Sequence, residues 1–146
     1  MESVVGIASG LHDRLLAMAA ASPQNEICGL MFGTAASIDD ATLCNNVAGD
    51  PSTTFEIDPT ALIAAHRAMR AGGTQLIGHF HSHPIGHAEP SVRDAAAANG
   101  DGMFWLIIAQ GEARLWRAVD GGPWLERFEP VALRITAPCA SSPASS

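Results

Sequence analysis

The histidines of this chain are concentrated in one short segment, and their spacing suits metal binding. Four of the six histidines lie between positions 79 and 87, and Ser91 and Asp94 follow shortly after them. In an extended strand, side chains two residues apart project to the same face, so His81 and His83 can reach one ion while Phe80 and Ser82 point away. Asp94 follows closely enough to return as a third ligand.

This set of side chains predicts a catalytic zinc site. Zinc held by two imidazoles and one carboxylate keeps a fourth position for water, whereas a structural zinc site has four protein ligands. The ion lowers the pKa of that water from about 15.7 toward about 7, which provides a hydroxide nucleophile at neutral pH. Glu26, in the string NEICGLMFG, is the candidate general acid/base, and Ser91 is the candidate hydrogen-bond donor to an oxyanion.

Each of these residues also has an ordinary structural interpretation. Ser91 and Asp94 match a capping box at the start of a helix. His81 and His83 fit a pair of hydrogen-bonded strand residues, and Glu26 taken alone fits a surface acid before a strand. For each residue taken alone, the structural interpretation and the catalytic or metal-binding interpretation are both open.

Three other residues near these positions are not predicted to take part in chemistry. His79 lies one pair further into the strand, where we expect it to pack beside the ligands without binding the ion. His87 is expected in a loop, facing solvent or substrate. Cys28 is expected to be a small buried residue, because no neighbouring histidine is available to form the thiolate that a cysteine nucleophile needs.

Composition predicts one compact, acidic domain. The chain has 146 residues, of which 47% are hydrophobic, and we expect one domain over residues 1–136 and a disordered tail over residues 137–146. Eight basic residues against fifteen acidic ones give a net charge of −7, which disfavours nucleic acid as a partner. The three cysteines, Cys28, Cys44 and Cys139, share no CxxC spacing and are predicted to be reduced thiols.

The sequence also predicts a cytoplasmic protein with no membrane partner. No apolar run approaches the roughly 20 residues of a membrane-spanning helix. The first ten residues, MESVVGIASG, lack the basic and then apolar order of a secretory signal.

Periodicity and turn residues indicate an α+β fold with a strand-rich centre. The first principal helix is expected to be capped by Ser9 and to end near Pro23, and the second to open at Asp58-Pro59 and stop at Gly72-Gly73. A short third helix is expected over 91–98. Strands are expected at 4–7, 28–33, 41–47, 55–58, 74–81, 103–109, 113–118 and 124–128.

The spacing of these candidates resembles the signature of the JAMM (MPN+) zinc metalloprotease family. The matching residues are Glu26, Cys28-Gly29 and the string HSHP, followed after six residues by Ser91 and after two more by Asp94. The strings CGLMFG, NNVA and FEIDP extend the similarity to small bacterial members over roughly residues 4–130. The resemblance implies the JAMM/cytidine-deaminase-like fold, a mixed β-sheet core flanked by helices.

The resemblance also implies roles and a partner. His81, His83 and Asp94 would be ligands to one Zn²⁺ with a catalytic water, Glu26 the general acid/base and Ser91 the oxyanion stabiliser. The family hydrolyses the amide bond after the C-terminal glycine of ubiquitin and ubiquitin-like proteins. Small bacterial members act on β-grasp sulfur carriers, so the expected partner is the C-terminal tail of such a carrier. The chain is short for the insertions that bind ubiquitin in eukaryotic members.

Two other functions fit the same sequence. Members of the fold that lack the ligands are non-catalytic scaffold or interaction domains. The string GHAEPS is similar to the corresponding loop of RadC-like, DNA-associated proteins, although the acidic composition and the lack of an N-terminal helical domain argue against this function. Zinc uptake and salt-dependent DNA binding distinguish the three hypotheses.

Overall fold

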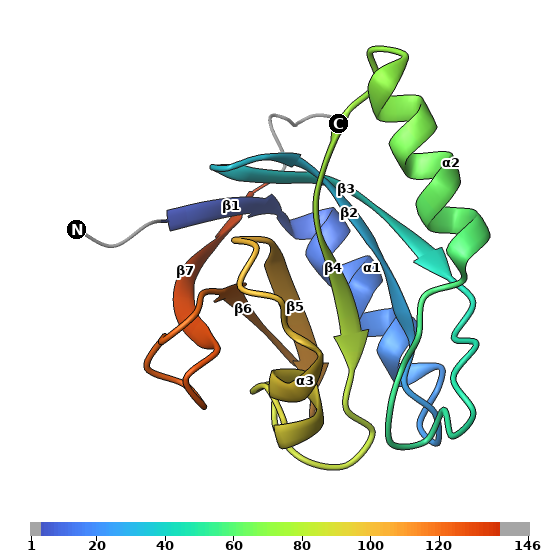
Figure 1. Cartoon of the computed structure of the whole chain (residues 1–146), viewed down its shortest axis with the longest axis vertical. Helices are drawn as coiled ribbons and strands as arrows, with labels where there is room; N and C mark the ends of the chain where they lie inside the picture. The colour runs from blue at the N-terminus through green and yellow to red at the C-terminus, as the bar shows by residue number, and fades with distance from the viewer. Residues whose placement is uncertain (1–3, 138–146) are drawn as a thin grey trace.

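The computed structural model describes residues 4–137, and these residues form a mixed sheet flanked by helices (Figure 1). The helices are α1 (Ser9–Ala20), α2 (Pro59–Arg70) and α3 (Val92–Ala97). The strands are β1 (Val4–Ala8), β2 (Cys28–Thr34), β3 (Ser37–Cys44), β4 (Gln75–Ser82), β5 (Phe104–Ala109), β6 (Glu112–Ala118) and β7 (Phe128–Thr136). This architecture confirms the predicted α+β fold class.

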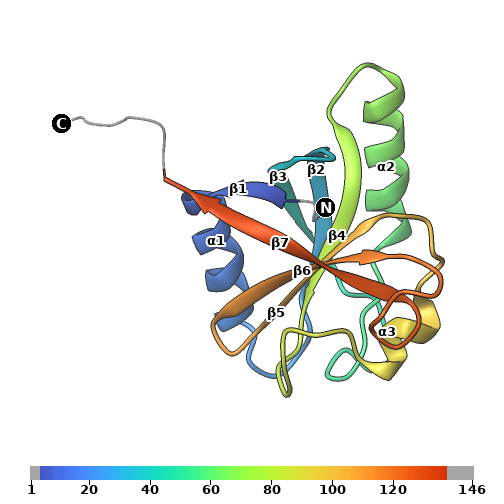
Figure 2. The ribbon, with the colours of Figure 1, turned by 90° about the vertical axis from the view of Figure 1, so that its left-hand side faces the viewer.

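The sheet closes into a barrel through the pairing of its first and last strands. The strand order is β1-β3-β2-β4-β5-β6-β7, and β1 pairs in parallel with both β3 and β7. Figure 2 shows β7 crossing the molecule to reach β1. Strands β4 and β5 are also parallel, whereas the other neighbours are antiparallel. Strand β4 pairs with β2 on one side and with β5 on the other.

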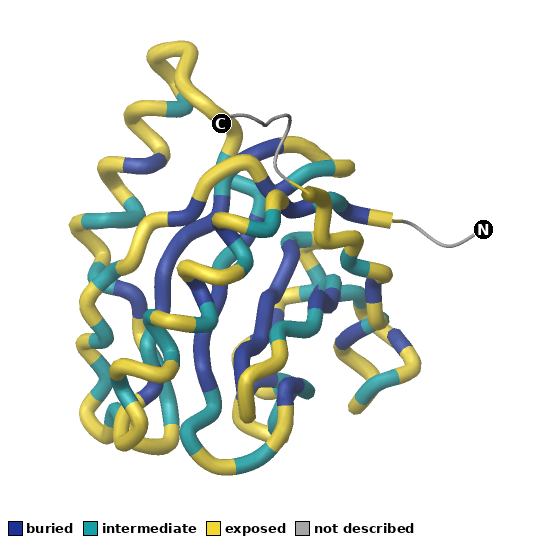
Figure 3. Tube along the Cα trace, turned by 180° about the vertical axis from the view of Figure 1, so that it is seen from behind, coloured by how far each residue is buried: buried dark blue, intermediate teal, exposed yellow. Residues whose placement is uncertain are grey.

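The two faces of the sheet are covered by different helices. On β5, Phe104, Leu106 and Ile108 join the core cluster that packs around α1, whereas Trp105 and Ile107 join a cluster on the opposite face. This alternation follows the two-residue period of a strand. Figure 3 shows the central strands as the most continuously buried part of the chain.

The alternation on β4 determines which side chains are available for chemistry. Phe80 is fully buried in the cluster around α1. His79 and His81 therefore lie on the other face, where their rings contact Phe55 and Trp105. The histidines project toward α2 and α3, away from the main apolar core.

The helix α2 begins and ends as the sequence predicts. The Asp58 side chain accepts a hydrogen bond of 3.0 Å from the Thr60 N–H, and Pro59 occupies the first turn. Arg67 and Arg70 lie in the last turn, where positive charge is favourable beside the helix C-terminus. No helix within residues 4–137 is long and apolar enough to cross a membrane.

The start of α1 and the bounds of β3 differ from the predictions. Ser9 is the first residue of α1 and not its cap, because the chain passes directly from β1 into the helix; the N-cap residue is Ala8, which makes no side-chain cap. The strand predicted over 41–47 is β3, which ends at Cys44 because Asn46 leaves the ladder. The Asn46 amide donates instead to the carbonyls of Glu26 and Thr54, at 2.9 Å and 3.1 Å.

Two other predicted strands are wrong. The strand predicted at 55–58 is a single bridge between Asn46 and Ile57, and the one predicted at 124–128 is a single bridge between Trp124 and Phe128. The strand β7, which follows, was not predicted, because most of its residues are exposed and its partners β6 and β1 are distant in sequence. Residues 138–146, most of the predicted disordered tail, lie outside the described residues, as does Cys139.

Gly29 allows β2 to pack closely against its neighbours, and its replacement by alanine should be strongly destabilising. A Cβ atom at this position would lie 2.2 Å from the Thr42 carbonyl oxygen and 2.4 Å from the Phe80 ring. We expect Gly29→Ala to lower the free energy of unfolding by about 3 kcal/mol or more, or to prevent folding, as measured by urea denaturation. Gly10→Ala is the matched control, because no other described residue would lie within 4 Å of a Cβ added there. Equal stability of the two variants would contradict this packing argument.

Candidate metal and catalytic site

The three predicted ligands meet at the C-terminal end of β4. His81 is in β4, His83 follows that strand, and Asp94 is in the first turn of α3. The Nε2 atoms of His81 and His83 are 3.2 Å apart. The Asp94 carboxylate lies 3.2 Å from the His81 Nε2 atom and 3.1 Å from the His83 Nε2 atom. Their ligand atoms all lie within 4.8 Å of one another. The structure therefore brings together residues that are thirteen positions apart in sequence.

The hydrogen bonds around this cluster fit a bound cation. The His83 Nδ1 donates to the His87 carbonyl oxygen at 2.8 Å, so the Nε2 of a neutral ring presents a lone pair to Asp94. Two imidazole nitrogens and a carboxylate in such contact repel each other unless a proton or a cation lies between them. Two histidines and one aspartate form a ligand set that zinc accepts, with a further position for water.

The electrostatics of Asp94 and His81 favour the protonation states of metal ligands, whereas those of His83 favour its protonated form in the metal-free protein. Burial acts to raise the pKa of Asp94, but hydrogen bonds from His81 and His83 hold this pKa far below its usual value. Burial lowers the pKa of His81 despite the nearby carboxylate. Burial also opposes protonation of His83, but its contact with Asp94 outweighs this effect and raises the pKa. Metal binding requires an ionised Asp94 and a neutral His81, and these are the protonation states that the two residues have here; the His81 side chain is fully buried.

Glu26 lies at the same site, immediately before β2. Its side chain is buried, and it lines a cavity of about 310 Å³ together with His83 and Ser91. Burial raises the pKa of Glu26 to about 7, and its Oε1 atom has no hydrogen-bond partner among the described residues. The Glu26 N–H donates to the Pro51 carbonyl at 2.7 Å, which fixes the backbone here. A carboxyl with this pKa can both accept and donate a proton near neutral pH.

Ser91 both caps α3 and borders the cavity. Its hydroxyl oxygen accepts the Asp94 N–H at 3.1 Å, and the Asp94 carboxylate accepts the Ser91 N–H at 2.9 Å. The capping box is therefore present, as the structural interpretation of this pair predicted. Capping uses a lone pair of the Ser91 oxygen and leaves its O–H free to donate into the cavity. The two interpretations of Ser91 are compatible.

The remaining residues considered in the sequence lie beside the cluster. His79 is packed between Phe55 and Trp105, and burial lowers its pKa to about 3, so it is a neutral ring. The side chain of His87 is exposed. Cys28 is a buried free cysteine, and burial raises its pKa to about 12, which is unsuited to a thiolate nucleophile.

Two supporting residues were missed by reasoning from the sequence. Asn46 donates to the Glu26 and Thr54 carbonyls and accepts from the N–H groups of Ala48 and Glu56, so it joins the Glu26 segment to the loop before α2. The Ser82 hydroxyl accepts the Ile27 N–H at 2.9 Å and joins the end of β4 to the same segment. Asparagine in a loop gives no local signal of such a role, because three of its partners are 8 to 20 residues away.

Comparison with known sequences identifies relatives of this chain. Residues 8–119 match the family model described as prokaryotic homologs of the JAB domain. The chain is 31% identical over 113 residues to a desampylase from Haloferax volcanii, covering 73% of this chain and 81% of the relative. It is 34% identical over 76 residues to a "probable TtuB-protein conjugate cleaving protease" from Thermus thermophilus, covering 46% of this chain and 51% of the relative.

Comparison with solved structures supports the fold. A solution structure of a protein from Desulfitobacterium hafniense superposes with a TM-score of 0.76 at 23% sequence identity. The alignment covers 93% of this chain and 95% of the other. At this identity the similarity concerns the fold alone.

The raised pKa of Glu26 predicts a stability change that depends on pH in the metal-free protein. Because the folded state holds this proton more tightly than the unfolded state, stability falls as pH rises from about 4.5 to about 7. We expect Glu26→Gln to remove that loss, so that its stability relative to wild type increases by roughly 1 to 3 kcal/mol between pH 4.5 and pH 8. Urea denaturation of both proteins at the two pH values measures the difference. A stability difference between the two proteins that does not change with pH would contradict the raised pKa of Glu26.

Proposed function

Because the chain belongs to the family of prokaryotic homologs of the JAB domain, and is thus a JAMM-type metalloprotease, we propose that it is a zinc-dependent isopeptidase acting on conjugates of ubiquitin-like proteins. One observation carries this proposal: the convergence of His81, His83 and Asp94 beside the buried carboxyl of Glu26. The names of the relatives from Haloferax volcanii and Thermus thermophilus support the class of substrate.

The residues divide the work of amide hydrolysis as follows. His81, His83 and Asp94 would hold the zinc, which when bound acts as a Lewis acid and increases the acidity of water. Glu26 accepts a proton from the attacking water and delivers it to the leaving amine as the carbon–nitrogen bond breaks. The Ser91 hydroxyl donates a hydrogen bond to the oxygen that gains negative charge. The products are a free carboxylate on the ubiquitin-like protein and a free amine.

A larger cavity beside the site suits the C-terminal tail of the partner. This cavity, of about 640 Å³, lies between α2, β4 and the segment after α3. Phe55 lines it and also stacks on His81, with ring centroids 4.2 Å apart, so the cavity begins directly beside the proposed metal ligands. An extended peptide advances about 3.3 Å per residue, so residues a few positions before the terminal glycine would reach it.

The lining of this cavity indicates which side chains it would take. Apolar residues such as Leu62, Met103 and Trp105 form much of the wall. Glu56 and Asp101 are exposed at this cavity, and no lysine or arginine among residues 4–137 lines it. An apolar side chain together with a basic one complements this surface. We therefore propose that the tail of a ubiquitin-like sulfur carrier with such side chains occupies it.

Metal content provides the first test of the proposal. We expect the purified protein to contain about one zinc per chain and His83→Ala to lose it, since one of three protein ligands is removed. His87→Ala is the matched control and should retain zinc, because this exposed side chain is outside the ligand cluster. Elemental analysis measures both. Absence of zinc from reconstituted wild type would support the scaffold hypothesis instead.

A hydrolysis assay with the zinc-containing protein tests the role of Glu26. We expect Glu26→Gln to retain zinc but to cleave a ubiquitin-like fusion protein about 10² to 10⁴-fold more slowly, because the proton carrier is lost. Gel analysis of the fusion protein over time gives the rates. Cleavage at the wild-type rate in Glu26→Gln or His81→Ala would contradict the mechanism.

Charge reversal tests the proposed tail cavity. The double substitution Glu56→Lys and Asp101→Lys should raise KM about tenfold for a substrate with a basic tail and leave kcat nearly unchanged, because exposed ion pairs each contribute up to about 1 kcal/mol. Asp13→Lys is the control, since this exposed residue lies on α1 on the opposite face of the sheet. Kinetics with the same fusion protein measure the effect. An unchanged KM in the double variant would show that the tail binds elsewhere.

A further inference from the structure

The loop between the second and third proposed metal ligands is an irregular segment that is held by other parts of the protein. Residues 84–90 form neither helix nor strand, yet they connect His83 to the capping box that contains Asp94. Gly86 has a φ of 117°, a conformation that favours glycine. The relative position of His83 and Asp94 therefore depends on how this loop is fixed.

Each of the five consecutive residues 86–90 accepts a hydrogen bond from a side chain. Four of the acceptors are backbone carbonyls, and the fifth is the carboxylate of Glu89. The donors, in order along the loop, are Gln110 Nε2, His83 Nδ1, Trp116 Nε1, an Arg114 guanidinium nitrogen and Trp124 Nε1. Apart from His83, all of the donors come from residues 110–124, at and after the hairpin turn of β5 and β6.

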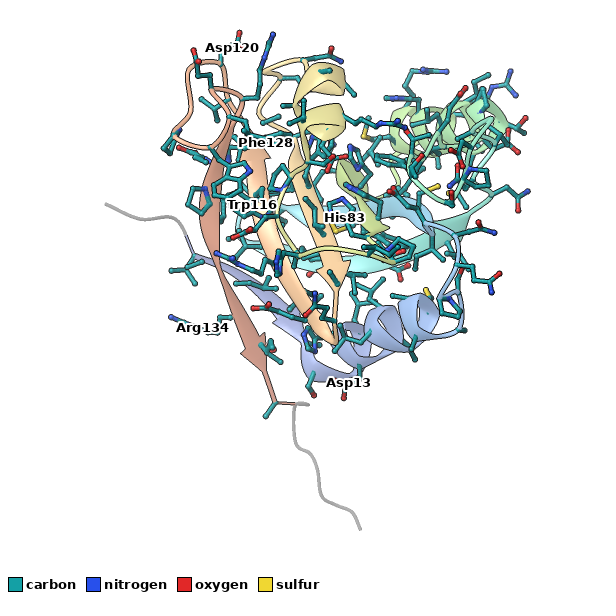
Figure 4. The ribbon with its side chains drawn as sticks, turned by 90° about the horizontal axis from the view of Figure 1, so that it is seen from below. Asp13, His83, Trp116, Asp120, Phe128 and Arg134 are labelled. Atoms are coloured by element: carbon teal, nitrogen blue, oxygen red, sulfur yellow. The ribbon has the colours of Figure 1, made fainter. Side chains whose placement is uncertain are left out.

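Two of these contacts come from tryptophan indoles, and the one from Trp116 is buried. The Trp116 indole N–H donates to the Ala88 carbonyl at 3.1 Å, and the Trp124 indole N–H donates to the Pro90 carbonyl at 2.9 Å. Trp116 is 2% exposed, and the two rings pack with centroids 5.3 Å apart. Arg114 lies over the Trp116 ring and pairs with Glu89. Figure 4 shows Trp116 and His83 from the end of the molecule at which the ligands meet.

We propose that Trp116 and Trp124 are positioning residues of the metal site. They fix the carbonyls on either side of Glu89, directly after the His87 carbonyl that orients the His83 ring. If these anchors are lost, the His87 carbonyl and the Asp94 cap are free to move relative to each other. This inference rests on the proposed metal site and extends it to residues that bind neither metal nor substrate.

Each substitution removes a single indole hydrogen bond to the loop, which is buried for Trp116 and partly buried for Trp124. Replacement of tryptophan by phenylalanine keeps an apolar ring but removes the indole N–H, which leaves the loop carbonyl without its donor. Groups that orient metal ligands typically change metal affinity by about 10 to 100-fold when they are mutated. We expect this range for each of Trp116→Phe and Trp124→Phe.

The experiment compares these variants with one that weakens the same core without touching the loop. Phe128→Leu is the control, because Phe128 belongs to the same buried cluster as Trp116 and makes no hydrogen bond to residues 84–90. The zinc Kd is measured by competition with a chelator, and Co²⁺ absorption reports ligand geometry. Amide hydrogen exchange of residues 85–91 is measured in metal-free protein, and urea denaturation gives the stability of each variant.

The expected result is a zinc Kd at least about tenfold higher in both tryptophan variants, with altered Co²⁺ spectra and faster exchange in the loop. Phe128→Leu should lose stability but keep Kd within about twofold of wild type. The inference is overturned if the tryptophan variants keep the wild-type Kd and spectrum, or if Phe128→Leu weakens zinc binding equally. If the wild type cleaves no conjugate, the proposed isopeptidase activity is contradicted, but the comparison of zinc Kd values among the variants still tests the role of the tryptophans.

Discussion

The convergence of two imidazole nitrogens and a carboxylate, within 3.2 Å of one another at the end of β4, is the constraint on which the rest of the site depends. His81 and His83 reach one point only because β4 alternates its side chains and is held between β2 and β5. The His83 N–H donates to the Ile108 carbonyl of β5 at 2.8 Å, which extends this support beyond the strand. Asp94 reaches the same point through the capping box of a short helix, so a local folding motif also provides a proposed ligand.

Burial at this site explains the properties of the proposed acid/base. Cys28 pairs with His81 in the ladder between β2 and β4, so the segment before β2 emerges beside the ligands and brings Glu26 with it. Removal from water raises the pKa of this carboxyl to about 7, while contact with histidines lowers that of Asp94. Two carboxyl groups at one site thus differ in pKa because one is desolvated and the other is paired with histidines.

The surroundings of the site divide into a rigid side and an open side. On one side, the side chains that follow β5 hold residues 86–90 through their carbonyls and Glu89. On the other side, α2 and Phe55 border the large cavity with its acidic and apolar lining. This division suits the proposed function, in which the site holds an ion at fixed distances and also admits a flexible peptide. The closed barrel supports the rigid side, because β6 pairs with β7 and β7 with β1.

The sequence by itself determined the features that depend on neighbours along the chain. The alternation of His81 and His83, the Asp58-Pro59 helix start, the fold class and most strands of the sheet were predicted, and the capping box of Ser91 and Asp94 was one of two interpretations of that pair. Only the tertiary structure showed β7, the hydrogen bonds of Asn46, the two indole anchors and the cavity beside His81. Those features join residues that are distant along the chain, and single residues in a loop or an exposed strand carry no periodicity that reveals their partners. Local pattern therefore predicted which side chains are suited to chemistry, and long-range pairing decided how they are held.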